Sequence, residues 1–175
     1  MLPSPRLTNG LIAGLCVVAM LFAYYLDGVL GLEPCPLCMT QRVFVVGCGL
    51  FALVAFAHGP GLLGRRVYAL IAGLFALGGG AVAARHVWLQ HLPDELVPAC
   101  GPGLSYMLET FPLSETLELI LMGDGNCAEV VWTFMGLSIP EQTLILFFAL
   151  TAANVWQLLR GETRTAEPAN EAGLA

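Results

Sequence analysis

Residues 67–84 read VYALIAGLFALGGGAVAA and contain no Asp, Glu, Lys or Arg. Three other stretches share this property: Leu7–Leu26, Val43–Gly64 and Gln142–Leu159. Each is close to the roughly 20 residues that a helix needs to cross the hydrocarbon core of a bilayer. Backbone groups inside lipid must satisfy their own hydrogen bonds, so each stretch is predicted to be a helix. Barrel strands do not fit, because they alternate in short segments.

The composition agrees with a chain that lies mostly in lipid. Of its 175 residues, 57% are hydrophobic and 11% are charged, and its basic residues are all arginine. Soluble domains have roughly 45–50% apolar and about 25% charged residues. We therefore predict an all-α membrane protein, a four-transmembrane-helix bundle formed by a single domain over residues 1–175. Its spans are expected at about 10–27, 42–59, 67–88 and 142–160.

The first span has an alternative interpretation as a removable signal peptide. Arg6 precedes an apolar run from Leu11 to Ala23, as in a secretory signal. One arginine makes a weak positive region, however, and Tyr24 and Tyr25 after the run are typical of a membrane interface. Whether or not the first span is removed, three further spans remain, so the chain is predicted to be a membrane protein in both interpretations.

The arginines predict the orientation. Five of them, Arg6, Arg65, Arg66, Arg160 and Arg164, fall on one side of a four-span protein, and the remaining two fall on the other. Because cytoplasmic loops are enriched in basic residues, both termini are predicted to be cytoplasmic. Residues 161–175 then form a flexible cytoplasmic tail. The net charge of −6 gives no reason to expect a nucleic-acid partner.

Four of the six cysteines fall in the two outward segments, and an even number of outward cysteines suggests disulfides. Cys16 and Cys48 lie in apolar runs and are interpreted as small buried hydrophobes. Cys35 and Cys38 form a Cys-X-X-Cys pair, whose thiols typically have depressed pKa values and accessible redox potentials. Cys38 stands at the start of the second span, where a helix N-terminus favours a thiolate.

Arg42 follows Cys38 by one helical turn, at the outer end of the same span. A cation at that depth needs a partner, for which a thiolate or a bound polar cofactor would each serve. The alternative is a snorkelling interfacial side chain. A zinc site built from the outward cysteines is a further alternative for the pair, although the other two cysteines lack a short ligand spacing.

The second outward pair, Cys100 and Cys127, has 26 residues between its members. A structural disulfide there would stabilise the fold by roughly 3–4 kcal/mol in the entropic account. Two pairs in opposite loops of a small bundle favour exchange between them instead. Gly123 and Gly125 next to Cys127 are expected to let the segment move.

Two further features belong to the outward side. Pro112–Leu121 is predicted to form a short helix, capped by Ser114, whose apolar stripe lies in the membrane interface. A helix packed on the bundle is the alternative. His86, at the outer end of the third span, could donate to a quinone oxygen or help a proton leave, since its ordinary pKa lies near neutrality. An isolated interfacial histidine is the alternative for His86.

Several motifs together resemble a known family. Cys35-Pro36-Leu37-Cys38 is followed by Gln41-Arg42, and Gly125-Asn126-Cys127-Ala128-Glu129 stands near Trp132. With the four spans and the second outward pair, the chain resembles the bacterial DsbB family of disulfide bond formation proteins. The resemblance runs from the first span to the fourth, and it implies a protein-disulfide:quinone oxidoreductase of the bacterial inner membrane.

The resemblance also implies roles for the four outward cysteines. Reduced DsbA, a periplasmic thioredoxin-fold protein, would attack the Cys100–Cys127 disulfide, with Cys100 as the mixed-disulfide partner. Electrons would then pass to Cys35–Cys38 through a transient link between Cys35 and Cys127.

The same resemblance implies a quinone site. Cys38 would reduce a membrane quinone, either ubiquinone or menaquinone, Arg42 would hold that quinone, and His86 would lie near it. No metal is expected at the site.

Two alternatives to the DsbA-linked activity stay open. The chain could serve a dedicated thioredoxin-fold partner with the same chemistry. It could also be a structural or transport bundle with permanent disulfides, in which case Cys38→Ser would not change its activity.

Overall fold

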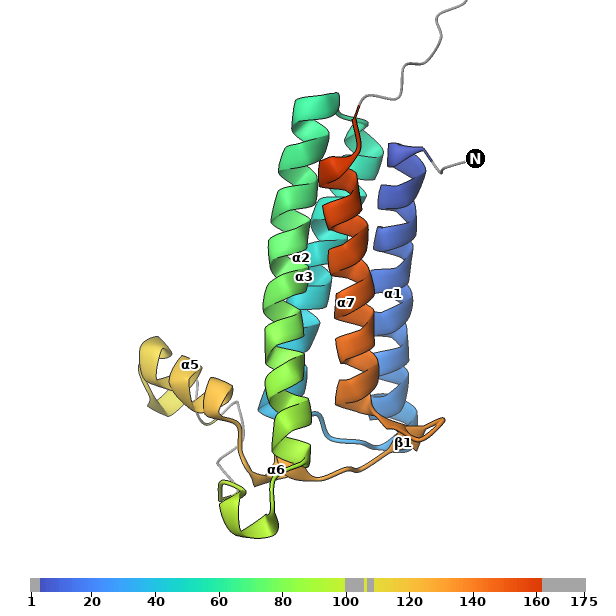
Figure 1. The fold of residues 1–175 in the computed structure, drawn as a ribbon. Helices are drawn as coiled ribbons and strands as arrows, with labels where there is room; N and C mark the ends of the chain where they lie inside the picture. The colour runs from blue at the N-terminus through green and yellow to red at the C-terminus, as the bar shows by residue number, and fades with distance from the viewer. Residues whose placement is uncertain (1–3, 100–105, 107–108, 162–175) are drawn as a thin grey trace, which may run out of the picture.

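Four long helices form a bundle in the computed structural model of the chain (Figure 1). The structure describes residues 4–99, 106 and 109–161. The long helices are α1 (Pro5–Leu30), α2 (Pro36–His58), α3 (Leu62–Gln90) and α7 (Ile139–Leu159), and all four are long and apolar enough to cross a membrane. The predicted four-helix membrane bundle is confirmed. Each of the first three helices begins several residues before the span expected from charge alone.

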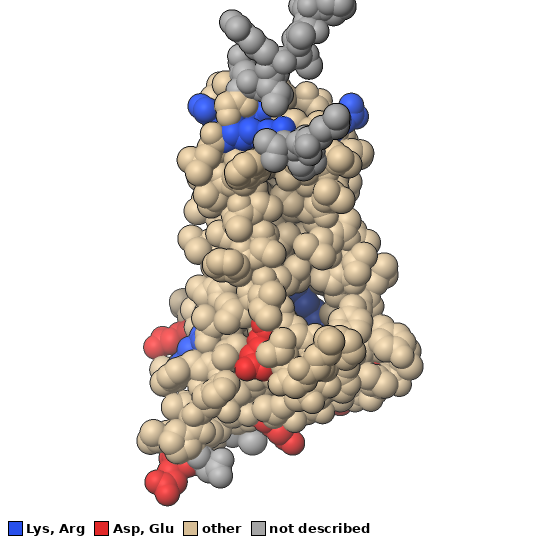
Figure 2. All heavy atoms as spheres, turned by 45° about the vertical axis from the view of Figure 1, so that its right-hand side comes forward, with Lys and Arg blue, Asp and Glu red and all other residues tan. Residues whose placement is uncertain are grey.

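The start of α1 and the end of α7, referred to below as the chain ends, lie at the same end of the bundle (Figure 1). The short elements gather at the opposite end: η1 (Asp94–Leu96), α5 (Leu113–Met122), α6 (Gly125–Ala128), β1 (Thr133–Phe134) and β2 (Leu137–Ser138). The two strands pair antiparallel, with Thr133 opposite Ser138. Basic side chains gather near the chain ends and acidic ones near the short elements (Figure 2). The charge asymmetry seen in the sequence is therefore an asymmetry of the folded molecule.

Local sequence signals fix where the long helices begin and end. Ser4 caps α1 by accepting a hydrogen bond from the backbone N–H of Leu7. Gly31 ends α1 and Gly59 ends α2, both in the left-handed conformation that glycine adopts without strain. Ser138 and Glu141 form a reciprocal capping box at the start of α7.

Helix α3 is the centre of the bundle, since it packs against both α2 and α7, while α1 packs mainly against α2. Small residues on α3 and α2, such as Ala76 and Ala52, are buried in these interfaces, and Phe147 of α7 is completely buried against them. Membrane helices associate through such close packing because lipid supplies no hydrophobic drive between them. The large apolar residues instead cover much of the outer surface.

Gly79 makes this packing testable. A Cβ at Gly79 would overlap the ring of Phe147, whereas a Cβ at Gly80 would lie 3.5 Å from the Phe147 Cβ, an ordinary contact. Because Phe147 is 0% exposed, its ring has no free space to move into. We expect Gly79→Ala to lower the free energy of unfolding by about 1–3 kcal/mol. Gly80→Ala is the matched control, and equal melting temperatures of both variants in detergent would contradict this packing.

Polar contacts join the helices near the chain ends. The Gln157 amide of α7 donates to the Asn9 side chain of α1, and both residues are buried. Arg65 at the start of α3 donates to the backbone carbonyl of Arg160, at 2.6 Å. Side-chain hydrogen bonds between membrane helices are worth about 1 kcal/mol each. The first contact holds α1 against α7, and the second holds the start of α3 against the end of α7.

The predicted short helix is present as α5, but its predicted cap is wrong. Pro112 is the N-cap, and Ser114 already lies in the first turn, because the proline backbone itself supplies the extended conformation that precedes a helix. Thr116 and Ile120 are buried, while Leu121 and Met122 are exposed. In Figure 1, α5 projects away from the side of the bundle. Its position relative to lipid stays a prediction.

Candidate thiol exchange site

Cys35 is the N-cap residue of α2. Its Sγ accepts a hydrogen bond from the backbone N–H of Cys38 at 3.4 Å, and the two sulfurs are 3.3 Å apart. The sequence placed the helix start at Cys38, whereas α2 begins at Pro36, which is favoured at a first helical position. The positive end of the helix dipole therefore acts on both sulfurs of the pair.

Cys127 reaches the start of α2 from the second outward segment. It lies in the short helix α6, where the Asp124 side chain accepts from the Cys127 backbone N–H at 3.2 Å. Cys127 is 0% exposed and packs in an apolar cluster with Leu37 and Leu89. This second core, separate from that of the bundle, holds the loop against the helix ends.

Gly123 allows this close approach. It has a φ of 74°, and a Cβ there would lie 2.5 Å from Leu89 and 3.1 Å from Leu37. Glycine is needed both for the left-handed backbone and for the missing side chain. The sequence suggested that this glycine gives mobility, but in the structure it packs the segment against α2 and α3.

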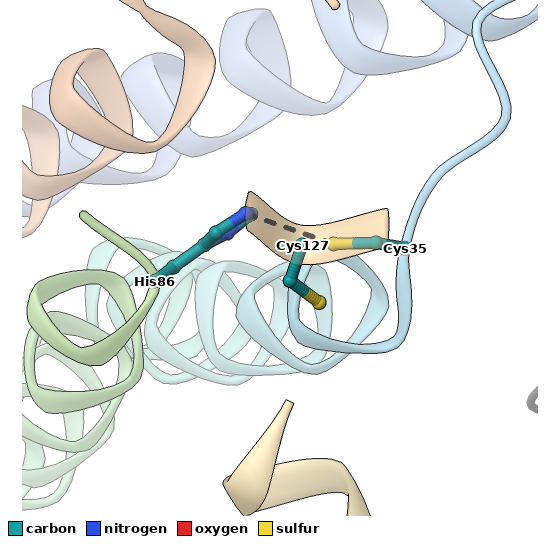
Figure 3. Close-up of side chains that lie close together, drawn as sticks. All are labelled: Cys35, His86 and Cys127. Atoms are coloured by element: carbon teal, nitrogen blue, oxygen red, sulfur yellow. Dashed lines mark hydrogen bonds between the residues drawn. The ribbon is translucent and has the colours of Figure 1, made fainter. Parts of the chain in front are cut away.

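The two cysteine segments meet at His86 of α3. The Cys35 and Cys127 sulfurs and a ring nitrogen of His86 all lie within 4.8 Å of one another. His86 Nε2 is 3.8 Å from Cys35 Sγ, and the two side chains point toward each other (Figure 3). The contact with Cys35, together with burial, raises the pKa of the Cys127 thiol. Negative charge in the reduced cluster is therefore disfavoured on Cys127.

His86 is 3% exposed and has a second partner that the sequence did not predict. The Nε2 of Gln41 lies 3.2 Å from His86 Nδ1. An amide donating to Nδ1 leaves the proton of a neutral imidazole on Nε2, which faces Cys35. Cys38 Sγ is 4.0 Å from Nδ1, so the ring touches both members of the Cys-X-X-Cys pair. His86 is thus more than an isolated interfacial histidine.

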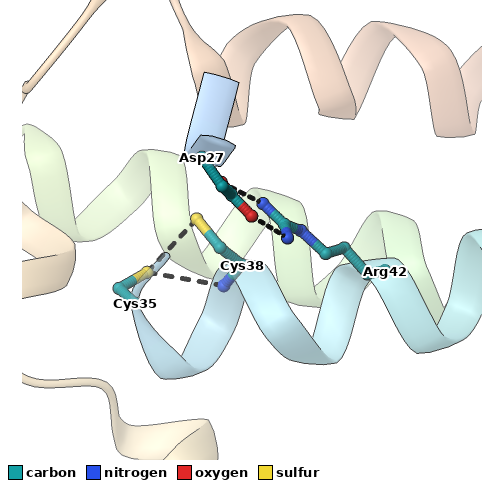
Figure 4. Close-up of polar contacts among 4 residues, drawn as sticks. All are labelled: Asp27, Cys35, Cys38 and Arg42. Atoms are coloured by element: carbon teal, nitrogen blue, oxygen red, sulfur yellow. Dashed lines mark hydrogen bonds and ion pairs between the residues drawn. The ribbon is translucent and has the colours of Figure 1, made fainter. Parts of the chain in front are cut away.

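Arg42 has a carboxylate partner (Figure 4). Its guanidinium forms a two-point ion pair with Asp27 at the end of α1, with N–O distances of 2.5 and 2.8 Å. The sequence suggested a thiolate or a bound cofactor as the partner, and it overlooked Asp27. A usable signal existed, because Asp27 directly follows a charge-free span on the same side as Arg42, and intramembrane charges usually pair with one another.

A cavity of about 570 Å³ lies beside these residues and is lined mainly by side chains of α1, α2 and α7. The residues that line it include Cys35, Cys38, Arg42 and His86, together with apolar side chains of α1 and α7 such as Met20 and Leu146. Figure 2 shows a hollow in the side of the molecule, and atoms of basic residues are visible deep inside it. Apolar walls with a few converging polar groups are typical of small-molecule sites.

The structure thus brings five of the six predicted site residues to one end of the bundle. Cys35, Cys127 and His86 form the cluster, Cys38 contacts Cys35 and His86, and Arg42 lines the adjoining cavity. Cys100 lies outside the described residues. The interpretation of Cys16 and Cys48 as core residues is confirmed, since they are 3% and 0% exposed.

Four membrane-length helices with converging thiols at one end define a multi-pass membrane protein of disulfide chemistry. The profile of the family described as "Disulfide bond formation protein DsbB" matches residues 5–157. The chain therefore belongs to the DsbB family, and its class is that of a disulfide-forming membrane oxidoreductase.

Relatives named "Disulfide bond formation protein B" agree with this assignment. The protein of Saccharophagus degradans is 54% identical over 159 residues, which cover 91% of this chain and 96% of the relative. The protein of Hahella chejuensis is 54% identical over 154 residues, covering 86% and 92%. That of Stutzerimonas stutzeri is 51% identical over 138 residues, covering 79% and 85%.

Proposed function

We propose that the chain is a thiol:quinone oxidoreductase of the bacterial inner membrane that reoxidises a DsbA-like periplasmic protein. One observation carries the proposal: Cys35 and Cys127 come from different outward segments, yet their sulfurs lie within 4.8 Å of each other and of His86. If both outward pairs were permanent structural disulfides, the protein would have no need to bring Cys35 and Cys127 so close together. Thiol–disulfide exchange, by contrast, requires a thiolate to reach a disulfide sulfur.

The proposed electron path runs through both cysteine pairs. A thiolate of the reduced partner attacks Cys100 of the Cys100–Cys127 disulfide, which forms a mixed disulfide and releases Cys127. Cys127 then attacks Cys35 of the Cys35–Cys38 disulfide, which forms the Cys35–Cys127 bond and frees Cys38. The partner's second thiol releases Cys100, and Cys100 attacks Cys127 to restore its disulfide and free Cys35. Two electrons now reside in the Cys35–Cys38 dithiol.

The cavity fits a quinone ring. A volume of about 570 Å³ is within the usual range for small-molecule sites, and Cys38 and Arg42 both line it. Asp27 occupies two of the five N–H groups of Arg42, which leaves others to donate to a ligand oxygen. A quinone bound there supplies an acceptor for two electrons and two protons. In this proposal Cys38 would deliver the electrons, and its thiol proton would pass to His86 Nδ1, which lies 4.0 Å from Cys38 Sγ, in place of the hydrogen bond from Gln41.

The proposed orientation places both chain ends in the cytoplasm and the thiol site in the periplasm. It is supported by the basic side chains that gather at the end of the bundle where the chain ends lie (Figure 2). We expect a reporter enzyme fused after Arg160 to behave as cytoplasmic, and one inserted near Gly103 to behave as exported. The reverse result in cells would place the thiols in a reducing compartment and end the proposal.

Quinone reduction by the purified protein is the direct test. Detergent-purified protein is mixed with a reduced DsbA-like protein and a soluble quinone, and quinone absorbance is followed with time. We expect one quinone reduced for each partner disulfide formed, because two electrons leave each dithiol. A partner that stays reduced, or a quinone signal that does not change, would contradict the proposal. Ubiquinone-type and menaquinone-type acceptors can be compared in the same assay.

A further inference from the structure

The cluster of Cys35, His86 and Cys127 has the composition of a metal site. Two thiols and an imidazole are preferred zinc ligands, with Zn–S bonds of about 2.3 Å and Zn–N bonds of about 2.0–2.1 Å. A tetrahedral ion with those bonds separates its sulfurs by about 3.8 Å, and a sulfur from a nitrogen by about 3.5 Å. In the structure Cys35 Sγ lies 3.8 Å from His86 Nε2, and the three ligand atoms lie within 4.8 Å of one another. If the three ligand atoms moved by an ångström or less, all of them could bind the same ion.

We propose that the reduced protein binds Zn²⁺ through Cys35 Sγ, His86 Nε2 and Cys127 Sγ, and that bound zinc blocks exchange between the two cysteine pairs. The inhibitory half of this proposal rests on the proposed function, and the binding half does not. The site differs from a resident structural zinc, because its sulfurs are available only while both disulfides are reduced.

The charge of the two thiolates and the contact between Gln41 and His86 both favour a divalent ion in this buried position. Cys127 and His86 are buried, and two thiolates cancel the charge of a divalent cation, so the assembled site is neutral. Metal-bound histidines usually donate their other ring N–H to a neighbouring acceptor. The Gln41 amide lies 3.2 Å from His86 Nδ1 and supplies that acceptor once it rotates to present its oxygen.

Cys38 is the nearest source of a fourth ligand. Its Sγ is 3.3 Å from Cys35 Sγ, but it lies on the Nδ1 side of His86, 4.0 Å from that nitrogen. Three protein ligands with an open fourth position are sufficient for zinc. Since Cys35 cannot bind zinc and attack or accept a sulfur at once, occupancy halts transfer through Cys127.

Cobalt binding tests the site without any measurement of activity. Protein in detergent, reduced with a phosphine under argon, is titrated with Co²⁺, which gives visible bands in tetrahedral sites and a near-ultraviolet charge-transfer band with thiolates. We expect one Co²⁺ per chain, displaced by Zn²⁺. Cys127→Ser and His86→Gln should each weaken binding at least about a hundredfold, since even loss of a supporting partner costs 10–100-fold.

Matched controls separate this site from other thiols. The Cys16→Ala/Cys48→Ala double variant removes only the buried core thiols and should bind Co²⁺ as the parent does. Wild-type protein oxidised at both outward disulfides should bind none, which needs no variant to fold. Full binding by Cys127→Ser, or binding that survives oxidation, would overturn the site.

The inhibitory half has its own readout. Zn²⁺ added to the quinone assay should stop turnover, and a chelator should restore it. Unchanged turnover at a Zn²⁺ concentration that fills the site would overturn inhibition and leave binding intact. If the wild type does not reduce quinone at all, the proposed function fails, while the cobalt titration still decides the metal site.

Discussion

Cys38→Ala is expected to abolish quinone reduction while Cys35 and Cys127 remain able to join. Cys35 and Cys38 both line the cavity, but only Cys35 also belongs to the cluster with His86 and Cys127, so Cys38 is the sulfur left to deliver electrons to a ligand there. Loss of a nucleophile that acts in a chain of covalent steps costs at least about a thousandfold in rate. Quinone absorbance measures this loss directly. Peptide mapping under non-reducing conditions should show a Cys35–Cys127 disulfide, which forms when the free Cys35 thiolate attacks Cys127 of the Cys100–Cys127 disulfide and releases Cys100 as a thiol.

Cys48→Ala is the matched control on the same helix. Cys48 is 0% exposed in the bundle core, so its loss leaves a small cavity and no change in the outward thiols. Its quinone turnover should match that of the wild type. If Cys38→Ala retained turnover, or if Cys35 were found bonded to a partner other than Cys127, the electron path proposed above would be wrong.

Asp27→Asn is expected to raise the KM for quinone by roughly tenfold, with a smaller change in kcat, because a lost charge-assisted hydrogen bond to a positioned group is worth about 1.5–3 kcal/mol. Asp27 holds the Arg42 guanidinium at two points, and the two side chains are only 25% and 17% exposed. An asparagine can hold one N–H of the fork but cannot balance its charge. We also expect stability to fall by about 2 kcal/mol, since Arg42 becomes an unpaired, partly buried cation.

Two variants distinguish positioning of Arg42 from a general charge effect. Glu33 also lines the cavity, yet within the described part of the chain it forms no ion pair, so Glu33→Gln should change neither KM nor melting temperature. Asp27→Glu keeps the carboxylate and should recover part of the quinone affinity. Equal KM values for Asp27→Asn and the wild type would show that Arg42 binds its ligand without help from Asp27.

The fold could be predicted because the charge-free runs that form its helices can be read directly from the order of residues in the sequence. Lipid excludes charges, so uninterrupted runs such as residues 67–84 identify spans without any knowledge of packing. The thiol pairs were visible for a similar reason, since Cys-X-X-Cys is a local motif. The predicted helix starts were less accurate, because N-cap residues such as Cys35 and Pro112 depend on local backbone geometry.

The partners of the site residues could not be predicted in the same way. Whether Asp27 faces Arg42 depends on how α1 and α2 are rotated about their axes, and many rotations keep the same residues in lipid. Gln41 reaches His86 only because α2 and α3 pack side by side. The role of Gly123 depends on the side chains of Leu37 and Leu89, which come from those two helices. Such pairings are properties of the assembled bundle.

The position of the cavity along α1 and α7 has a consequence for ligand choice. The buried Gln157–Asn9 contact joins them near the chain ends, and the cavity lies toward the other end. A long isoprenoid chain could therefore stay among the lipid acyl chains while only its head group entered the protein. Short-chain and long-chain acceptors that share a ring should consequently compete on nearly equal terms, so that the membrane's own supply decides which one is used.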